Sequence, residues 1–143
     1  MPLQLTAMIA FPPRDTIRFA LPATAVHCSD GRSVLLEAVS PEGSGVLLRL
    51  RYRDSLVSDS FPVVVPDDTA AVPGAIVAVR YFLRDAPHGI VLDSGTARVT
   101  RERKRISARI GGSALENAIR QPARIEYRDV PFSADTVTCN YEP

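Results

Sequence analysis

The sequence has no tryptophan, one lysine and two histidines, and these shortages narrow what the protein can be. His27 and His88 stand without a neighbouring cluster of Cys or His residues, so the ligand spacing of a zinc site is missing. Sugar rings stack on exposed aromatic side chains, and tyrosine occurs only four times here. We therefore expect no metal and no cofactor. A small-ligand or carbohydrate-binding module is kept as the alternative interpretation.

Motifs for nucleotide binding and nucleophilic catalysis are also missing. The chain contains no P-loop, no G-x-G-x-x-G fingerprint and no G-x-S-x-G nucleophile elbow. A Ser-His-Asp triad stays open, because such triads are assembled in space from distant residues. On these grounds we expect a protein that is not an enzyme.

Long apolar runs are absent, since no stretch approaches the roughly 20 residues of a membrane-spanning helix. We expect no transmembrane segment. The start, MPLQLTAMIAFPPRD, does not resemble a signal peptide, because it lacks a basic region and its apolar stretch is short and interrupted. Three origins stay open: an intracellular protein, a chain given without its export signal, or export by another route.

The charged residues are nearly balanced but unusual in type. The formal net charge is +1, which gives no overall attraction to nucleic acid. Sixteen of the seventeen basic residues are arginine, and arginine favours planar, bidentate contacts with carboxylates and phosphates. Coding bias in a GC-rich genome explains the same composition, so a docking role for these arginines is one of two interpretations.

Alternation of apolar and polar residues dominates the chain and predicts β-strands. In GVLLRLRYR, for example, Val46, Leu48 and Leu50 fall on one face and Arg49 and Arg51 on the other. The 143 residues fit a single domain, 1–143. We predict an antiparallel β-sandwich of about nine to eleven strands. The candidate strand segments, twelve in number and so one more than the predicted range, are 3–9, 15–20, 23–28, 33–39, 46–53, 61–65, 75–83, 88–92, 95–101, 105–112, 123–128 and 135–139.

One short segment has a helical signature. In GSALENAIR, residues 112–120, Ser113 is placed to cap a helix with Glu116 three residues later. A nine-residue helix barely nucleates alone, so a loop is the alternative. We expect at most this one helix.

The two cysteines, Cys28 and Cys139, fall near the end of an early predicted strand and in the last one. First and last strands are often neighbours in a sandwich, so we expect a disulfide between them that holds the chain terminus. Two unrelated buried thiols are the alternative. A disulfide would place the protein in the periplasm or outside the cell, whereas free thiols would suit the cytoplasm.

The segment Asp93-Ser94-Gly95-Thr96 follows an apolar pair and resembles the active-site motif of aspartic proteases. That chemistry needs two facing aspartates that share a proton, and this chain has one copy, placed late. Asp-Ser-Gly is also a common hairpin turn. We interpret Asp93 as a turn residue and keep an aspartic-protease-like hydrolase as a distant third possibility.

Two basic clusters are candidates for docking a partner. One lies on the polar face of strand 46–53, and the other forms the turn between strands 95–101 and 105–112. Their members are Arg49, Arg51 and Arg53, and Arg101, Arg103, Lys104 and Arg105. A solvated turn is the alternative for the second cluster. Aromatic residues do not interleave with the basic ones, so we expect no nucleic-acid partner.

The segments GAIVAVRYFLRDAPHGIVLDSGTARV and DTVTC resemble small exported bacterial β-sandwich proteins with a disulfide between early and late strands. Some such proteins are membrane-extrinsic accessory subunits of large complexes, photosynthetic ones among them. The resemblance implies a non-catalytic subunit with protein partners in a larger assembly, a membrane-embedded complex being one such case. It carries no diagnostic motif and transfers no functional residue.

Overall fold

The structure is a computed structural model that describes residues 3–11, 15–53, 56, 59–65, 73–83, 85–116 and 118–139. These residues form eleven strands and no helix. The strands are β1 (Leu5–Phe11), β2 (Asp15–Leu21), β3 (Thr24–Cys28), β4 (Ser33–Val39), β5 (Gly45–Arg51), β6 (Asp59–Pro62), β7 (Gly74–Leu83), β8 (Ala86–Val91), β9 (Ser94–Arg101), β10 (Arg105–Glu116) and β11 (Ile119–Val137). The expected all-β fold is confirmed.

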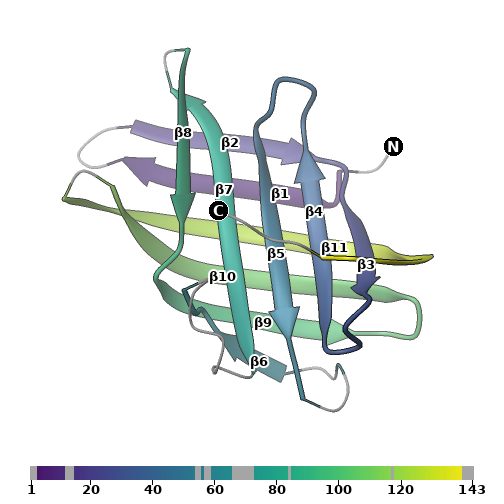
Figure 1. The fold of residues 1–143 in the computed structure, drawn as a ribbon. Helices are drawn as coiled ribbons and strands as arrows, with labels where there is room; N and C mark the ends of the chain where they lie inside the picture. The colour runs from purple at the N-terminus through teal and green to yellow at the C-terminus, as the bar shows by residue number, and fades with distance from the viewer. Residues whose placement is uncertain are drawn as a thin grey trace.

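The strands form one continuous sheet that folds over into two layers (Figure 1). One layer contains β2, β1, β11, β10, β9 and β6, and the other contains β3, β4, β5, β7 and β8. The strands of one layer run across those of the other in Figure 1. The strand pairs are antiparallel except β11 with β3, which is parallel. The sandwich is therefore mixed rather than purely antiparallel.

Strand β11 connects the two layers. Its middle pairs with β1, and its last residues pair with β3. Between these stretches Ser107 of β10 faces both Arg128 and Asp129, which makes a β-bulge. Asp129 has a φ of 49°, and its N–H donates to the Ser107 Oγ at 2.9 Å. The strand predicted at 135–139 is therefore the end of one long strand, and Cys139 lies just beyond it.

The core lies between the layers and follows the predicted alternation. Val46, Leu48 and Leu50 of β5 are buried, as the sequence pattern predicts. Two buried tyrosines, Tyr81 and Tyr127, join them. The Tyr127 hydroxyl donates to the Val46 carbonyl at 2.9 Å, so it links β11 to the opposite layer while satisfying its own buried polar group.

The helix predicted over 112–120 is wrong. These residues form the end of the β10–β11 hairpin, where Ser113 pairs with Pro122 and Glu116 with Ile119. The Ser113 hydroxyl lies 2.9 Å from that of Ser94 on β9 instead of capping a helix. Residues 112–116 have backbone partners in β11, and residues 112 and 113 also have partners in β9. A short helix cannot match these contacts because its nucleation is unfavourable.

Candidate docking surface

The Cys28–Cys139 disulfide is present, with an Sγ–Sγ distance of 2.01 Å. It joins Cys28, the last residue of β3, to Cys139, which lies two residues after the end of β11. The two cysteines are 111 residues apart in the sequence. A backbone bond from the Ser29 N–H to the Val137 carbonyl, at 2.7 Å, supports the same junction. The disulfide is compatible with an oxidising compartment.

Arg49, the first member of the row on β5, is bound to the protein itself. Its guanidinium donates to the Asp30 carboxylate at 3.2 Å, to the Ser33 hydroxyl and to the Cys139 carbonyl at 3.3 Å. Burial raises the pKa of Asp30, but bonds from the Arg32 N–H, the Ser33 hydroxyl and Arg49 outweigh it, and the net shift is downward. Arg49 therefore fastens the C-terminal segment to β5.

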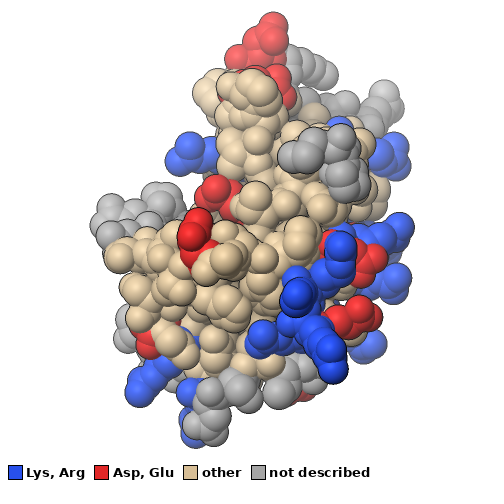
Figure 2. All heavy atoms as spheres, turned by 90° about the vertical axis from the view of Figure 1, so that its right-hand side faces the viewer, with Lys and Arg blue, Asp and Glu red and all other residues tan. Residues whose placement is uncertain are grey.

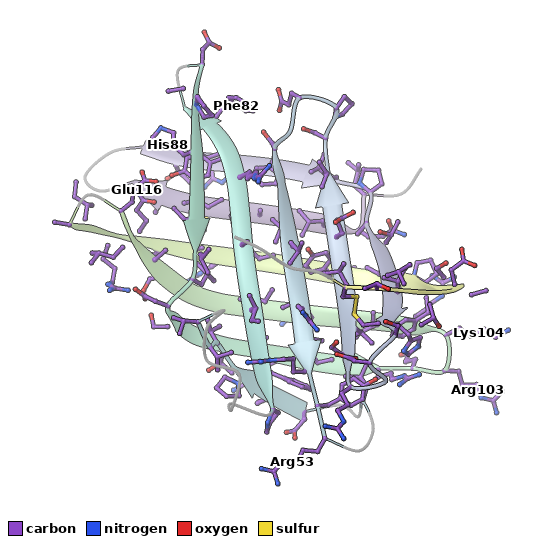
Figure 3. The ribbon with its side chains drawn as sticks, in the orientation of Figure 1. Arg53, Phe82, His88, Arg103, Lys104 and Glu116 are labelled. Carbon is purple, nitrogen blue, oxygen red and sulfur yellow. A yellow bond between two sulfur atoms is a disulfide. The ribbon has the colours of Figure 1, made fainter. Side chains whose placement is uncertain are left out.

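The other two members of that row differ from Arg49 in exposure. Arg51 is half-buried at the last position of β5. Arg53 lies beyond the strand, is exposed and points away from the body of the molecule in Figure 3. The row on 49–53 therefore does not act as one surface, and its exposed member is Arg53.

The second basic cluster is a hairpin turn, as predicted. Glu102 and Arg105 close the turn between β9 and β10 with backbone bonds of 3.0 and 3.4 Å. Arg103 and Lys104 are exposed at its tip and extend into solvent in Figure 3. Arg105 is exposed and donates to the Asp129 carbonyl at 3.1 Å, so it also braces the bulge of β11.

Arg101 supports this turn from below. Its guanidinium carbon lies 5.1 Å from the centre of the Phe132 ring, a cation–π contact. The His27 ring stacks on Phe132 at 4.6 Å between ring centres. Burial, and then the charge of Arg101, lower the pKa of His27, so the imidazole is held neutral. Arg101 also donates to the Leu56 carbonyl at 3.3 Å, which ties the segment after β5 to the hairpin.

The structure thus gathers four of the predicted docking residues at or beside the β9–β10 turn, whereas Arg53 lies apart from them beyond the end of β5 in Figure 3. We define the basic end by its members: Arg101, Arg103, Lys104 and Arg105. Figure 2 faces the side on which Arg103 and Lys104 lie in Figure 3, and it shows basic side chains grouped in one part with acidic ones beside them. The charge is patchy, which is the distribution expected of a nearly neutral chain with local basic clusters.

Asp93 lies in the two-residue link between β8, which pairs with β7, and β9, which pairs with β6 and β10. The segment therefore crosses from one layer to the other, and the expected Asp-Ser-Gly hairpin turn is wrong, because Ser94, Gly95 and Thr96 begin β9. Arg120 donates to its carboxylate at 2.6 and 3.4 Å and is the main cause of the lowered pKa of Asp93. Gly95 has a φ of 128°, and a Cβ there would overlap the Gly111 carbonyl. Glycine at position 95 is therefore required by the close approach of β10, and the Asp93 carboxylate is paired with a cation rather than with a second carboxyl group.

A polar cluster between the layers was missed by the sequence analysis. His88 begins the predicted strand 88–92 and lies in β8, where its Nδ1 is 3.0 Å from Glu116 Oε1. Its ring stacks on Tyr81, whose hydroxyl donates to the buried Gln121 at 3.3 Å. The residues come from β7, β8, β10 and β11, so no local motif could reveal them. Burial raises the pKa of Tyr81 to about 12, which keeps the phenol protonated.

No family model matches the chain, and neither a curated protein nor a solved structure shows significant similarity to it. Within the described ranges, no group of three His, Cys, Asp or Glu residues is arranged to hold a metal ion. The described part of the chain contains no helix with the length and apolar character needed to cross a membrane. The functional argument therefore depends on the surface of the molecule.

Proposed function

We propose that the protein is a non-catalytic accessory subunit that docks on a larger assembly through its basic end and stabilises it. The observation that carries the proposal is the β9–β10 turn, where Arg103 and Lys104 are exposed on a closed backbone turn. The Arg101–Phe132–His27 stack lies beneath this turn and holds it in place. A charged tip that is already ordered loses little conformational entropy on binding.

The expected partner is a protein surface with carboxylates, at the membrane-facing or peripheral side of a complex. Opposite charge orients two proteins and raises their encounter rate, whereas desolvated Arg–carboxylate pairs set specificity. Each exposed pair contributes only about 0–1 kcal/mol, so several must act together. The disulfide supports a location in an oxidising compartment, either the periplasm or the cell exterior.

The test is to reverse the exposed tip with Arg103→Glu and Lys104→Glu and to measure retention on the native assembly across a salt series. Arg101 and Arg105 are left in place because they also support the fold. We expect the variant to dissociate at clearly lower salt than the wild type. Arg80→Glu, an exposed position on β7, is the control for a general charge effect.

Two results would contradict the proposal. Unchanged retention of the tip variant would remove the basic end from docking. A protein that migrates as a lone monomer in gentle native extracts would overturn the subunit proposal itself and favour the small-ligand alternative.

A further inference from the structure

A groove of about 900 Å³ lies on the outer face of the layer that contains β2, β1, β11, β10 and β9. This face is turned away from the core and from the other layer. Four arginines line the groove, together with a single acidic residue, Glu126. The arginines are Arg18, Arg98, Arg109 and Arg124. None of the residues of the basic end lines it.

The hollow has a specific cause in the sequence. Gly111 lies within β10, is exposed, and pairs with Thr96 on one side and Arg124 on the other. A Cβ at this position would meet nothing within 4 Å, so the missing side chain leaves open space among longer neighbours. Glycine weakens a strand, and within a strand it often marks the close approach of a ligand or of another backbone.

Within the described residues, the charges around this hollow are only partly neutralised, because Arg109 alone of the four arginines has an acidic partner, Glu126. Arg98 and Arg109 stand directly opposite each other on β9 and β10, an arrangement that destabilises a sheet. Glu126 is shared by Arg109 and Arg128, which lies just outside the groove. In the part of the chain that the structure describes, Arg18, Arg98 and Arg124 make no hydrogen bond or ion pair. Unfavourable charge placement of this kind is expected at functional sites.

We propose that this groove binds an acidic segment of a partner polypeptide in extended conformation. The groove crosses five strands, which at about 4.8 Å each span roughly 19 Å, the length of about six extended residues. Guanidinium groups pair with carboxylates in bidentate fashion. The small floor residues Gly111 and Ala20 leave room for a backbone with short side chains.

Charge and shape favour a peptide over the other anionic partners. Bases of single-stranded nucleic acid stack on aromatic side chains, and the aromatic residue in the lining, Phe19, packs against the core. A membrane surface is broad and flat and would reach the rim of a hollow rather than its floor. The proposal goes beyond docking through the basic end, and it can hold even if that end binds nothing.

The experiment is a fluorescence anisotropy titration of the intact, oxidised protein at low salt with a labelled peptide of alternating glutamate and alanine. The matched glutamine–alanine peptide is the probe control. We expect saturable binding of the acidic peptide and no binding of the neutral one. The double variant Arg98→Gln with Arg124→Gln should weaken binding about tenfold, because two ion pairs are lost.

Gly111→Leu tests the hollow directly, because it fills the groove without changing its charge. We expect it to weaken peptide binding about tenfold or more, since steric blockade removes several contacts at once. Gly89→Leu is the matched control, because Gly89 is an exposed β8 glycine of the other layer with nothing within 4 Å of its Cβ position. Thermal unfolding of both variants establishes that each is folded.

The tip variant Arg103→Glu with Lys104→Glu separates this inference from the proposed function. It should keep the peptide affinity of the wild type within about twofold, because the groove lies elsewhere. Equal peptide binding by Gly111→Leu and wild type would overturn the groove site. An oligonucleotide or anionic vesicle that binds more tightly than the peptide, and loses that binding in Gly111→Leu, would overturn the choice of occupant.

Discussion

The surface of β5 and the outer face of β9 to β11 both carry arginines at alternating strand positions, but the two regions use them in opposite ways. On β5, Arg49 makes contacts with Asp30, Ser33 and Cys139 and is about one-fifth exposed. On β9, Arg98 is exposed and faces another arginine. An arginine with several partners contributes to the fold, whereas one that faces another arginine is available for an external anion, as proposed above.

The largest expected effect comes from removing the disulfide, which holds the C-terminal segment next to Arg49 of β5. Replacement of Cys139 by serine should lower the free energy of unfolding by about 2–5 kcal/mol, because the unfolded chain regains the freedom of a long loop. Urea unfolding of oxidised wild type and variant measures this. Cys28→Ser should cost a similar amount, and the double variant little more. A loss below about 1 kcal/mol would mean that Arg49 and the β-ladder hold the C-terminal segment alone.

Arg49→Met should have an intermediate effect. It removes the bonds to Asp30 and to the Cys139 carbonyl but keeps much of the apolar stem, so we expect a loss of about 1–2 kcal/mol at neutral pH. The exposed Arg53→Met is the control and should stay within about 0.5 kcal/mol of the wild type. Chemical denaturation of the three proteins tests the difference, and equal losses for both variants would contradict the distinction between bound and exposed arginines.

The pH dependence of this difference has a definite sign. The pKa of Asp30 is lower in the folded protein than its ordinary value of 3.8, so the folded state favours the carboxylate. That stabilisation is present above pH 3.8 and is lost as the pH falls through the lower folded value. Unfolding measured from neutral to strongly acidic pH should therefore show the gap between wild type and Arg49→Met closing at the acidic end.

The smallest expected effect has the opposite direction. Arg98→Thr should raise stability by a few tenths of a kcal/mol, because it removes the repulsion of Arg109 and places a β-branched residue in a strand. Arg18→Thr is the control, since Arg18 faces Met8 across the ladder. Added salt should reduce the gain by screening the wild-type repulsion. Destabilisation by Arg98→Thr, measured by thermal unfolding, would show that this arginine serves the fold after all.

Local patterns predicted the strands and the tip of the hairpin, because each depends on residues close in the chain. The predicted strand 33–39 coincides with β4, and the turn at 102–104 lies where the basic run predicted it. The disulfide between Cys28 and Cys139 followed from one added assumption about which strands are neighbours. The capping pattern at Ser113 failed because its residues had strand partners in two other segments.

The groove could not be predicted in the same way. Its arginines come from β2, β9, β10 and β11 and meet only once the strand order is known. The parallel pairing of β11 with β3 could not be predicted either, because the residue pattern of a strand does not indicate whether its neighbour runs parallel or antiparallel. A sequence signal did exist in Gly111, a glycine in an otherwise regular alternation, but its meaning depends on the neighbours that the fold supplies.

Strand β11 pairs with β10, β1 and β3, and this has a consequence for co-translational folding. The first hairpin, β1 with β2, pairs with the rest of its layer through β11, which is translated after the other ten strands. Until then the nascent chain carries an open strand edge and an uncovered apolar face, features that invite association with other chains. We therefore expect this layer to complete its folding only after β11 has been translated.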